Sequence, residues 1–204
     1  MATRNPQVRN PELSEVIKQQ SCTAINWLVP ADSANYFKTS TALAAQTTTL
    51  AAASMTKSYV TDVPVVPIIV VTNSGVSVAW TSVTGTVVGI DQFGHKIAET
   101  IAGVVSNVNQ TWTLTAVNAY ATLISVAFTI AGGTAADSND SYVIGFGKTY
   151  GLGVNIGASG DVLVHNFNLA TDAGTISVAN NTYTFAGTPD AAKYGYLYVR
   201  SSAY

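Results

Sequence analysis

Few side chains in this 204-residue sequence could carry out acid–base or nucleophilic chemistry. It contains two histidines, His95 and His165, and one cysteine, Cys22. A Cys–His pair would make a nucleophile if the two side chains lay within hydrogen-bond reach. However, no motif flanks Cys22, His95 lies in a turn sequence, and His165 alternates with Val164 and Asn166 in a predicted strand. We therefore expect no catalytic residues and no enzymatic activity.

The eleven acidic residues are spread over turn sequences and form no obvious pair for acid–base catalysis. The preference of Asp for turns explains nearly all of these positions. One segment, Asp137-Ser-Asn-Asp140, has enough oxygen atoms to contact Ca²⁺ but lacks the glycine and the distal glutamate of an EF-hand loop. Whether that loop binds an ion stays open, and we predict no metal site and no cofactor.

A glycine-rich stretch has a superficial likeness to a phosphate-binding loop, with glycines at positions 145, 147, 151 and 153. A P-loop requires a Lys-Ser or Lys-Thr pair at a fixed spacing and a helix directly after it. Neither is present in the sequence that follows. We therefore interpret these glycines as strand bulges and turns.

Tyrosine is concentrated near the C-terminus, and this is the strongest sign of a binding surface. Because tyrosine is enriched at protein interfaces, the cluster can be a contact surface. It can equally be the aromatic rim of an ordinary β-sandwich. If the cluster is functional, contact with a protein is favoured over contact with a glycan. The predicted interface residues are Tyr183, Tyr194, Tyr196, Tyr198 and Tyr204.

The composition excludes several classes of function. Charged residues make up only 10% of the chain, against about 25% in an average soluble domain. A net charge of −2 argues against nucleic-acid binding, which needs a basic surface. The longest apolar run, residues 63–71, is far shorter than the roughly 20 residues of a membrane span, and the N-terminus lacks the apolar core of a signal peptide. We expect neither nucleic acid nor a membrane as partner.

The elements that would position these residues are strands. From about residue 36 onward, runs of Thr, Val, Ile and Ala are separated by turn residues at intervals of about ten. The predicted elements include strands over residues 65–72, 141–145 and 194–200 and a β-hairpin over residues 77–101. About ten short strands and almost no helix predict an all-β fold, an antiparallel β-sandwich of the Ig-like or jelly-roll type. We predict a sandwich domain over residues 36–204, with a possible C-terminal strand extension from about residue 154.

Residues 1–35 read as an extended N-terminal arm. This segment carries three prolines and one short amphipathic stretch, in which Leu13, Val16 and Ile17 share a helical face. A helix over residues 12–20 would be too short to be stable by itself. We therefore predict an assembly arm that a neighbouring molecule holds in place.

The central strands carry motifs with a family resemblance. The run Val83-Thr-Gly-Thr-Val-Val-Gly-Ile-Asp-Gln-Phe-Gly94 is followed by Glu99-Thr-Ile101 and later by Tyr142-Val-Ile-Gly-Phe-Gly-Lys-Thr-Tyr-Gly-Leu-Gly153. Over roughly residues 40–200, this order of strands and turns resembles virion proteins of tailed bacteriophages. The resemblance implies a structural protein of the virion and transfers no catalytic residues.

The resemblance and the composition together lead to one expected function. We expect an accessory capsid protein, of the decoration or cement type, that binds the major capsid protein and stabilises the head shell. It would be made in the bacterial cytoplasm, reside on the capsid surface and self-associate, with a trimer expected by analogy with other cement proteins.

Two alternatives stay open. One is a head fibre, spike or tail component of the same particle. The other is a carbohydrate-binding β-sandwich that uses the C-terminal tyrosines. The scattered positions of Trp27, Trp80 and Trp112, two of them in predicted core strands, weigh against glycan binding.

Overall fold

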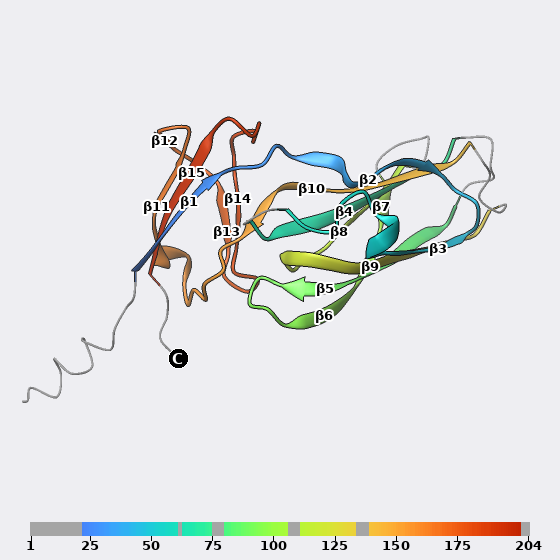
Figure 1. The fold of residues 1–204 in the computed structure, drawn as a ribbon, viewed down its shortest axis with the longest axis horizontal. Helices are drawn as coiled ribbons and strands as arrows, with labels where there is room; N and C mark the ends of the chain where they lie inside the picture. Colours follow the sequence, from blue (N-terminus) through green and yellow to red (C-terminus); the bar gives the residue numbers. More distant parts are fainter. Residues whose placement is uncertain (1–21, 61–62, 75–79, 106–110, 134–138, 201–204) are drawn as a thin grey trace, which may run out of the picture.

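The computed structural model describes residues 22–60, 63–74, 80–105, 111–133 and 139–200. Apart from two single-turn 3-10 helices, η1 (Ala52–Ser54) and η2 (Ser159–Asp161), the regular structure of these residues is all strand. Every strand pair is antiparallel, and the sheets curl into a sandwich (Figure 1). The predicted all-β, antiparallel β-sandwich is therefore confirmed. The helix predicted over residues 12–20 lies outside the described residues.

The main body, which we call the large lobe, consists of strands β2 to β10. Their bounds are β2 (Ser33–Ala42), β3 (Thr47–Ala51), β4 (Val65–Thr72), β5 (Ser82–Asp91), β6 (Lys96–Ala102), β7 (Val104–Val105), β8 (Thr111–Thr115), β9 (Tyr120–Ala131) and β10 (Ser141–Gly151). One layer is β3-β9-β5-β6 and the other is β2-β10-β4-β8-β7. A single residue pair, Val65 with Tyr120, joins β4 to β9, so the continuous sheet folds over at that point.

Alternating apolar residues fill the space between the two layers. The rings of Phe128 on β9 and Tyr142 on β10 meet with their centroids 5.1 Å apart. A Cβ atom on Gly85 of β5 would lie 2.7 Å from Leu114 of β8, so only glycine lets the layers approach this closely. Ile69, Leu114 and Val126 are completely buried in this core.

The predicted β-hairpin at the centre of the chain is present as β5 and β6. Its strands pair from Ile90 with Lys96 outward. The carboxylate of Asp91 accepts hydrogen bonds of 2.8 Å from the backbone N–H groups of Phe93 and His95, and Gly94 has the positive φ that the turn needs. The local turn chemistry therefore sets the register of this hairpin.

The glycine-rich stretch forms the second half of β10, which is longer than the predicted strand over residues 141–145. A Cβ atom on Gly145 would lie 1.8 Å from the carbonyl oxygen of Ser33, so glycine allows β2 to pass against β10. Gly151 ends the strand, and Gly153 has a φ of 66° in the turn after it. The interpretation as strand and turn glycines is confirmed.

At one end of the molecule, the small lobe consists of β1 and β11 to β15 (Figure 1). Their bounds are β1 (Cys22–Leu28), β11 (Val162–Phe167), β12 (Ala170–Thr171), β13 (Thr175–Ser177), β14 (Thr182–Thr184) and β15 (Tyr194–Arg200). Four of them form a separate sheet in the order β1-β15-β11-β12. The hairpin β13–β14 instead pairs with the end of β10 and so belongs to the large sheet.

The described part of the expected N-terminal arm, residues 22–35, consists mainly of strand. β1 pairs with β15 over seven residue pairs, from Cys22 with Arg200 to Leu28 with Tyr194. β2 then begins at Ser33, inside the range assigned to the arm. Residues 1–21 lie outside the described residues.

Aromatic rings and one glutamine hold the two lobes together. A chain of ring contacts runs from Phe146 through Tyr150 and Phe185 to Tyr183, with centroid distances of 6.2, 5.7 and 4.9 Å. The side chain of Gln92 donates to the carbonyl of Asn180 over 2.8 Å, and its oxygen accepts from the N–H of Gly153 over 2.9 Å. The small lobe is thus fixed to the hairpin β5–β6 and to β10.

Candidate functional site

The outer side of the four-stranded sheet in the small lobe carries exposed apolar and amide side chains. Along β15, Tyr194 and Tyr196 point outward and are 56% and 38% exposed, whereas Leu197 and Val199 are completely buried. β1 alternates in the same way, with Ala24, Asn26 and Leu28 exposed and Ile25 buried, whereas a bulge after Val162 interrupts the alternation in β11. We call this outer side the tyrosine face; its residues are Asn26, Leu28, Val164, Asn166, Leu169, Tyr194 and Tyr196.

The strand register places two amides beside one tyrosine ring. On β15, Tyr196 lies directly between Asn26 of β1 and Asn166 of β11. One row further, Leu28 lies opposite Tyr194. Directly opposed side chains on neighbouring strands are close enough to act together. The face thus presents phenol rings flanked by groups that can both donate and accept hydrogen bonds.

These residues line a shallow depression of about 410 Å³, formed by Asn26, Asn166, Leu169, Tyr194 and Tyr196. None of the five carries a formal charge at neutral pH. Its volume is within the range of about 300–1,000 Å³ typical of ligand pockets. The depression suits a neutral, partly apolar partner.

A strained turn forms one side of the depression. Asn168 and Leu169, which link β11 to β12, have φ angles of 52° and 65°. Asn tolerates the left-handed region, but for Leu it is unfavourable by roughly 1–2 kcal/mol. The Leu169 side chain is 98% exposed, so no intramolecular packing compensates for this strain. Strained residues of this kind concentrate at functional sites.

The inner side of the same sheet packs on aromatic residues. Leu197 and Val199 are completely buried, and Ile25 is 8% exposed. A Cβ atom on Gly195 would lie 2.5 Å from the Phe185 ring, which explains the glycine between two tyrosines. This packing determines which side of β15 faces outward.

A buried carboxylate, Asp172, ties the hairpin β13–β14 to this sheet. It accepts a hydrogen bond of 2.7 Å from the Tyr183 hydroxyl and bonds of 3.1 Å from the backbone N–H groups of Ala186 and Gly187. The Tyr183 hydroxyl also lies 3.3 Å from Nδ1 of His165 on β11. Burial, followed by the hydrogen bond to Asp172, raises the pKa of Tyr183, which keeps the hydroxyl protonated as a donor.

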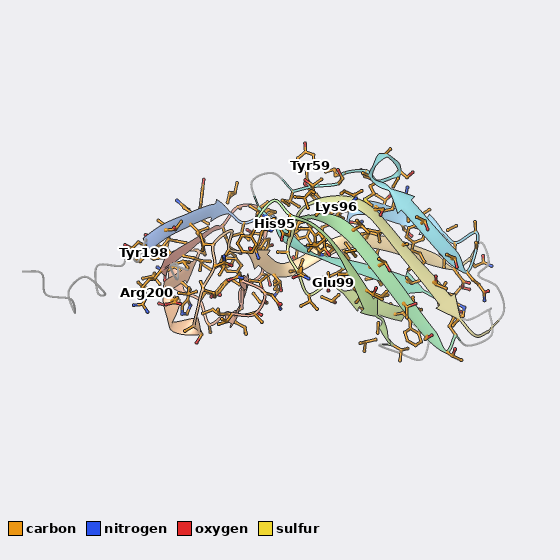
Figure 2. All side chains as sticks on the ribbon, turned by 90° about the horizontal axis from the view of Figure 1, so that it is seen from below. Tyr59, His95, Lys96, Glu99, Tyr198 and Arg200 are labelled. Carbon is orange, nitrogen blue, oxygen red and sulfur yellow. The ribbon has the colours of Figure 1, made fainter. Side chains whose placement is uncertain are left out.

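A second carboxylate, Asp161, anchors the end of β15. Arg200 donates to it from Nε and from Nη2, over 3.0 and 2.9 Å. The N–H groups of Gly157 and Ala158 also donate to it. The hydrogen bond from Arg200 is the main reason why the pKa of Asp161 is lowered. Figure 2 shows Arg200 and Tyr198 in the small lobe, away from His95 and Glu99.

The structure separates the five tyrosines predicted as interface residues. Tyr194 and Tyr196 lie together on the tyrosine face, and Tyr198 is half-buried further along the same side of β15. Tyr183 is completely buried behind the sheet, with its hydroxyl on Asp172. Tyr204 lies outside the described residues.

Sequence reasoning missed Asn26, Asn166 and Leu169. Residues 22–28 fall within the predicted arm, so the sequence alone gives Asn26 no cross-strand partner. Asn166 alternates in a predicted strand, and that pattern could have placed it on the same side as Val164. No sequence signal marks Leu169, because leucine is not expected in the left-handed turn conformation.

The two histidines considered for catalysis lie in different lobes. His95 is exposed in the β5–β6 turn, 3.6 Å from the carboxylate of Asp91. His165 is half-buried against Tyr183, and Asp140 is completely buried, where it accepts from the N–H of Ser74. Asp137 lies outside the described residues. Within the described ranges, no three His, Cys, Asp or Glu side chains come close enough to hold a metal ion.

Three further observations concern other parts of the molecule. A second depression of about 440 Å³ lies by β2 and η1, where Lys57 already covers the ring of Tyr36 at 4.6 Å. In the part of the chain that the structure describes, no helix has the length and hydropathy of a membrane span. Trp80 and Trp112 are buried, as their predicted core positions required.

Comparison with known proteins gives no match: no protein-family model, no curated protein and no solved structure is significantly similar to this chain.

Proposed function

We propose that this chain is a non-enzymatic structural protein of a bacteriophage virion, an accessory capsid protein that attaches through the tyrosine face. The observation that carries the proposal is the cluster of exposed, uncharged side chains around Tyr194, Tyr196 and Leu169. Contiguous apolar patches on a protein surface mark interaction sites, whereas isolated exposed apolar residues do not. The virion setting comes from the resemblance of the strand and turn motifs.

The chemistry of the face favours attachment by apolar burial over attachment by ion pairs. The chain has nine basic and eleven acidic residues, and none of them lines the depression. Apolar burial contributes about 25 cal/mol per Å². Attachment of this kind tolerates high salt, since screening weakens only interactions between charges.

The test is to reconstitute heads that lack the protein with wild-type chain or with a variant carrying Tyr196→Ser and Leu169→Ser. The matched control is Val104→Ser, which removes an apolar side chain that is 71% exposed on the large lobe. After a wash in about 1 M salt, where the Debye length is about 3 Å, wild type and control should remain bound. The face variant should be lost from the heads. Equal retention of all three would refute attachment through this face.

A carbohydrate-binding role is the second candidate, and one observation favours it. Tyr196 stands between the two amides of Asn26 and Asn166, an arrangement in which a sugar ring could stack on the phenol while its hydroxyls bond to the amides. Screening the chain against immobilised glycans tests this role. The carbohydrate-binding role would be supported by saturable glycan binding that Tyr196→Ser abolishes, if the wild-type chain also fails to bind heads.

A further inference from the structure

We infer that a second copy of this chain pairs with the open edge of β1. The two four-stranded sheets would then join across a two-fold axis into one continuous eight-stranded sheet. The inference concerns self-association and is argued from the unpaired edge of β1. Only one consequence, that pairing makes the tyrosine face large enough for docking, rests on the proposed function.

β1 is the last strand of its sheet. It pairs with β15 along its whole length, and the strand order ends there. Among the described residues, no strand pairs with its other side. Figure 2 shows β1 along the border of the small lobe, with the other strands of its sheet to one side. Such an edge presents unpaired N–H and C=O groups that can accept another strand.

The sequence of β1 lacks the features by which proteins protect an edge. Proteins commonly protect edges with charged residues, proline, bulges or short strands. The seven residues of β1, Cys-Thr-Ala-Ile-Asn-Trp-Leu, include no charge and no proline, and their pairing with β15 has no bulge. By contrast, the edge strand β6 carries Lys96 and Glu99, and β2 carries Lys38.

The remaining edges are shorter. β7 and β12 have two residues each and β13 has three. β3 is also uncharged, but it has five residues and runs directly into η1. β1 is therefore the longest unprotected edge within the described residues.

A second copy fits this edge better than an unrelated strand, because two β1 strands paired antiparallel place compatible residues opposite each other. In an antiparallel pair centred on Ile25, Ala24 lies opposite Asn26 of the second copy. Both positions are exposed and on the outer side, so outer residues meet outer residues. Ile25, which is 8% exposed on the inner side, would lie opposite its own counterpart. A two-fold axis sets no like charges against each other here, since β1 carries none.

The size of the tyrosine face gives an independent reason for pairing. Four strands spaced by about 4.8 Å, the longest of them seven residues long at about 3.3 Å per residue, cover at most roughly 20 by 23 Å. A standard interface buries about 800 Å² on each partner, which is more than this footprint. Pairing through β1 doubles the face, because the outer sides of both sheets become continuous.

The experiment introduces charges at two exposed, directly opposed positions of the full-length chain. Ala24→Lys together with Asn26→Lys places lysine opposite lysine at both equivalent sites of the pair. The matched control, Ala24→Lys with Asn26→Glu, places opposite charges there instead. Sedimentation equilibrium at low ionic strength should give wild type and control a mass of twice 21.2 kDa. The two-lysine variant should dissociate at least about tenfold more readily, a factor that corresponds to 1.4 kcal/mol.

Several outcomes would overturn the inference. A monomeric or trimeric wild type is one, and equal dissociation of the two double variants is another. Conversion of a monomeric chain into a dimer by removal of residues 1–20 would also overturn it, because that segment of the same chain would then cover the edge. Circular dichroism checks that each variant is folded. If the two-lysine chain does not fold, the masses of wild type and control still show whether the chain forms the dimer. Loss of head attachment in Tyr196→Ser with the dimer intact separates this inference from the proposed function.

Discussion

The large lobe buries aliphatic and aromatic side chains between two sheets, whereas the small lobe holds one sheet against a hairpin with aromatic rings and two buried carboxylates. In the large lobe, Ile69, Leu114 and Val126 are completely buried between the layers. In the small lobe, Asp161 and Asp172 are among the buried residues, and each accepts several hydrogen bonds. The small lobe has too few strands to enclose a thick core, so these polar contacts add to its apolar packing; the large lobe also buries a carboxylate, Asp140, beside its much larger apolar core.

The exposed apolar side chains are distributed differently on the two lobes. On the large lobe they are scattered over separate loops and strands: Tyr59, Phe93, Val104, Val105, Val117 and Ile124. On the small lobe they are Leu28, Leu163, Val164, Leu169, Tyr194 and Tyr196, most of them on the tyrosine face. Exposed apolar side chains are therefore gathered on one face of the small lobe, the face that we propose for attachment, whereas the large lobe contains most of the buried core.

The largest effect should come from the core of the large lobe. Phe128→Ala removes a completely buried ring that contacts Tyr142 across the layers. Because such a change also leaves a cavity, the free energy of unfolding should fall by about 3–5 kcal/mol. Denaturant unfolding followed by circular dichroism measures this. A loss below 1 kcal/mol would contradict the view that this layer carries the stability.

A smaller effect should follow from removing the buried carboxylate of the small lobe. Asp172→Ala leaves the Tyr183 hydroxyl and two backbone N–H groups without their acceptor, at a cost of at least about 2 kcal/mol. Hydrogen exchange should accelerate in β11, β13 and β14 and remain unchanged in β5 and β9. The control, Asp190→Ala, removes an exposed partner of Lys193 and should change little. Uniform acceleration in both lobes would show that they unfold as one unit.

The third effect is a pH dependence confined to the small lobe. The hydrogen bond from Arg200 holds the pKa of Asp161 below its ordinary value of 3.8. The stabilisation from this carboxylate is therefore fully present above the unfolded-state pKa and is lost as the pH falls through the lower folded-state pKa. Asp161→Asn should lower stability at pH 7 and flatten its fall below about pH 4. Thermal melts at a series of pH values, with Lys148→Gln as a control, measure this; parallel curves for wild type and Asp161→Asn would contradict it.

The smallest effect, of opposite sign, is expected at the strained turn. Leu169→Gly replaces a residue with a φ of 65° and an almost fully exposed side chain. Glycine adopts this conformation without strain, so stability should rise by up to about 1 kcal/mol, reduced by the greater freedom of glycine in the unfolded chain. The same substitution should weaken binding through the tyrosine face. A clear loss of stability would show that Leu169 contributes to the fold.

Local patterns in the sequence predicted much of the fold. Val65–Thr72 and Tyr194–Arg200 are strands with the predicted bounds, because alternation and flanking turn residues define a strand locally. The β5–β6 hairpin was predictable for the same reason, since Asp91 and Gly94 make its turn. β1 could not be recognised, because its strand character depends on β15, more than 160 residues away.

What the sequence determined by itself is the all-β class, the low charge and the positions of most strands and tight turns, because these depend on composition and on neighbours a few residues apart. Only the tertiary structure decided which tyrosines are exposed. Packing of Gly195 against Phe185 and burial of Leu197 turn Tyr194 and Tyr196 outward, while a hydrogen bond to Asp172 fixes Tyr183 inside. Likewise, only pairing across the whole chain brings Asn26 beside Tyr196, because contacts between distant strands follow from register and packing rather than from local preference.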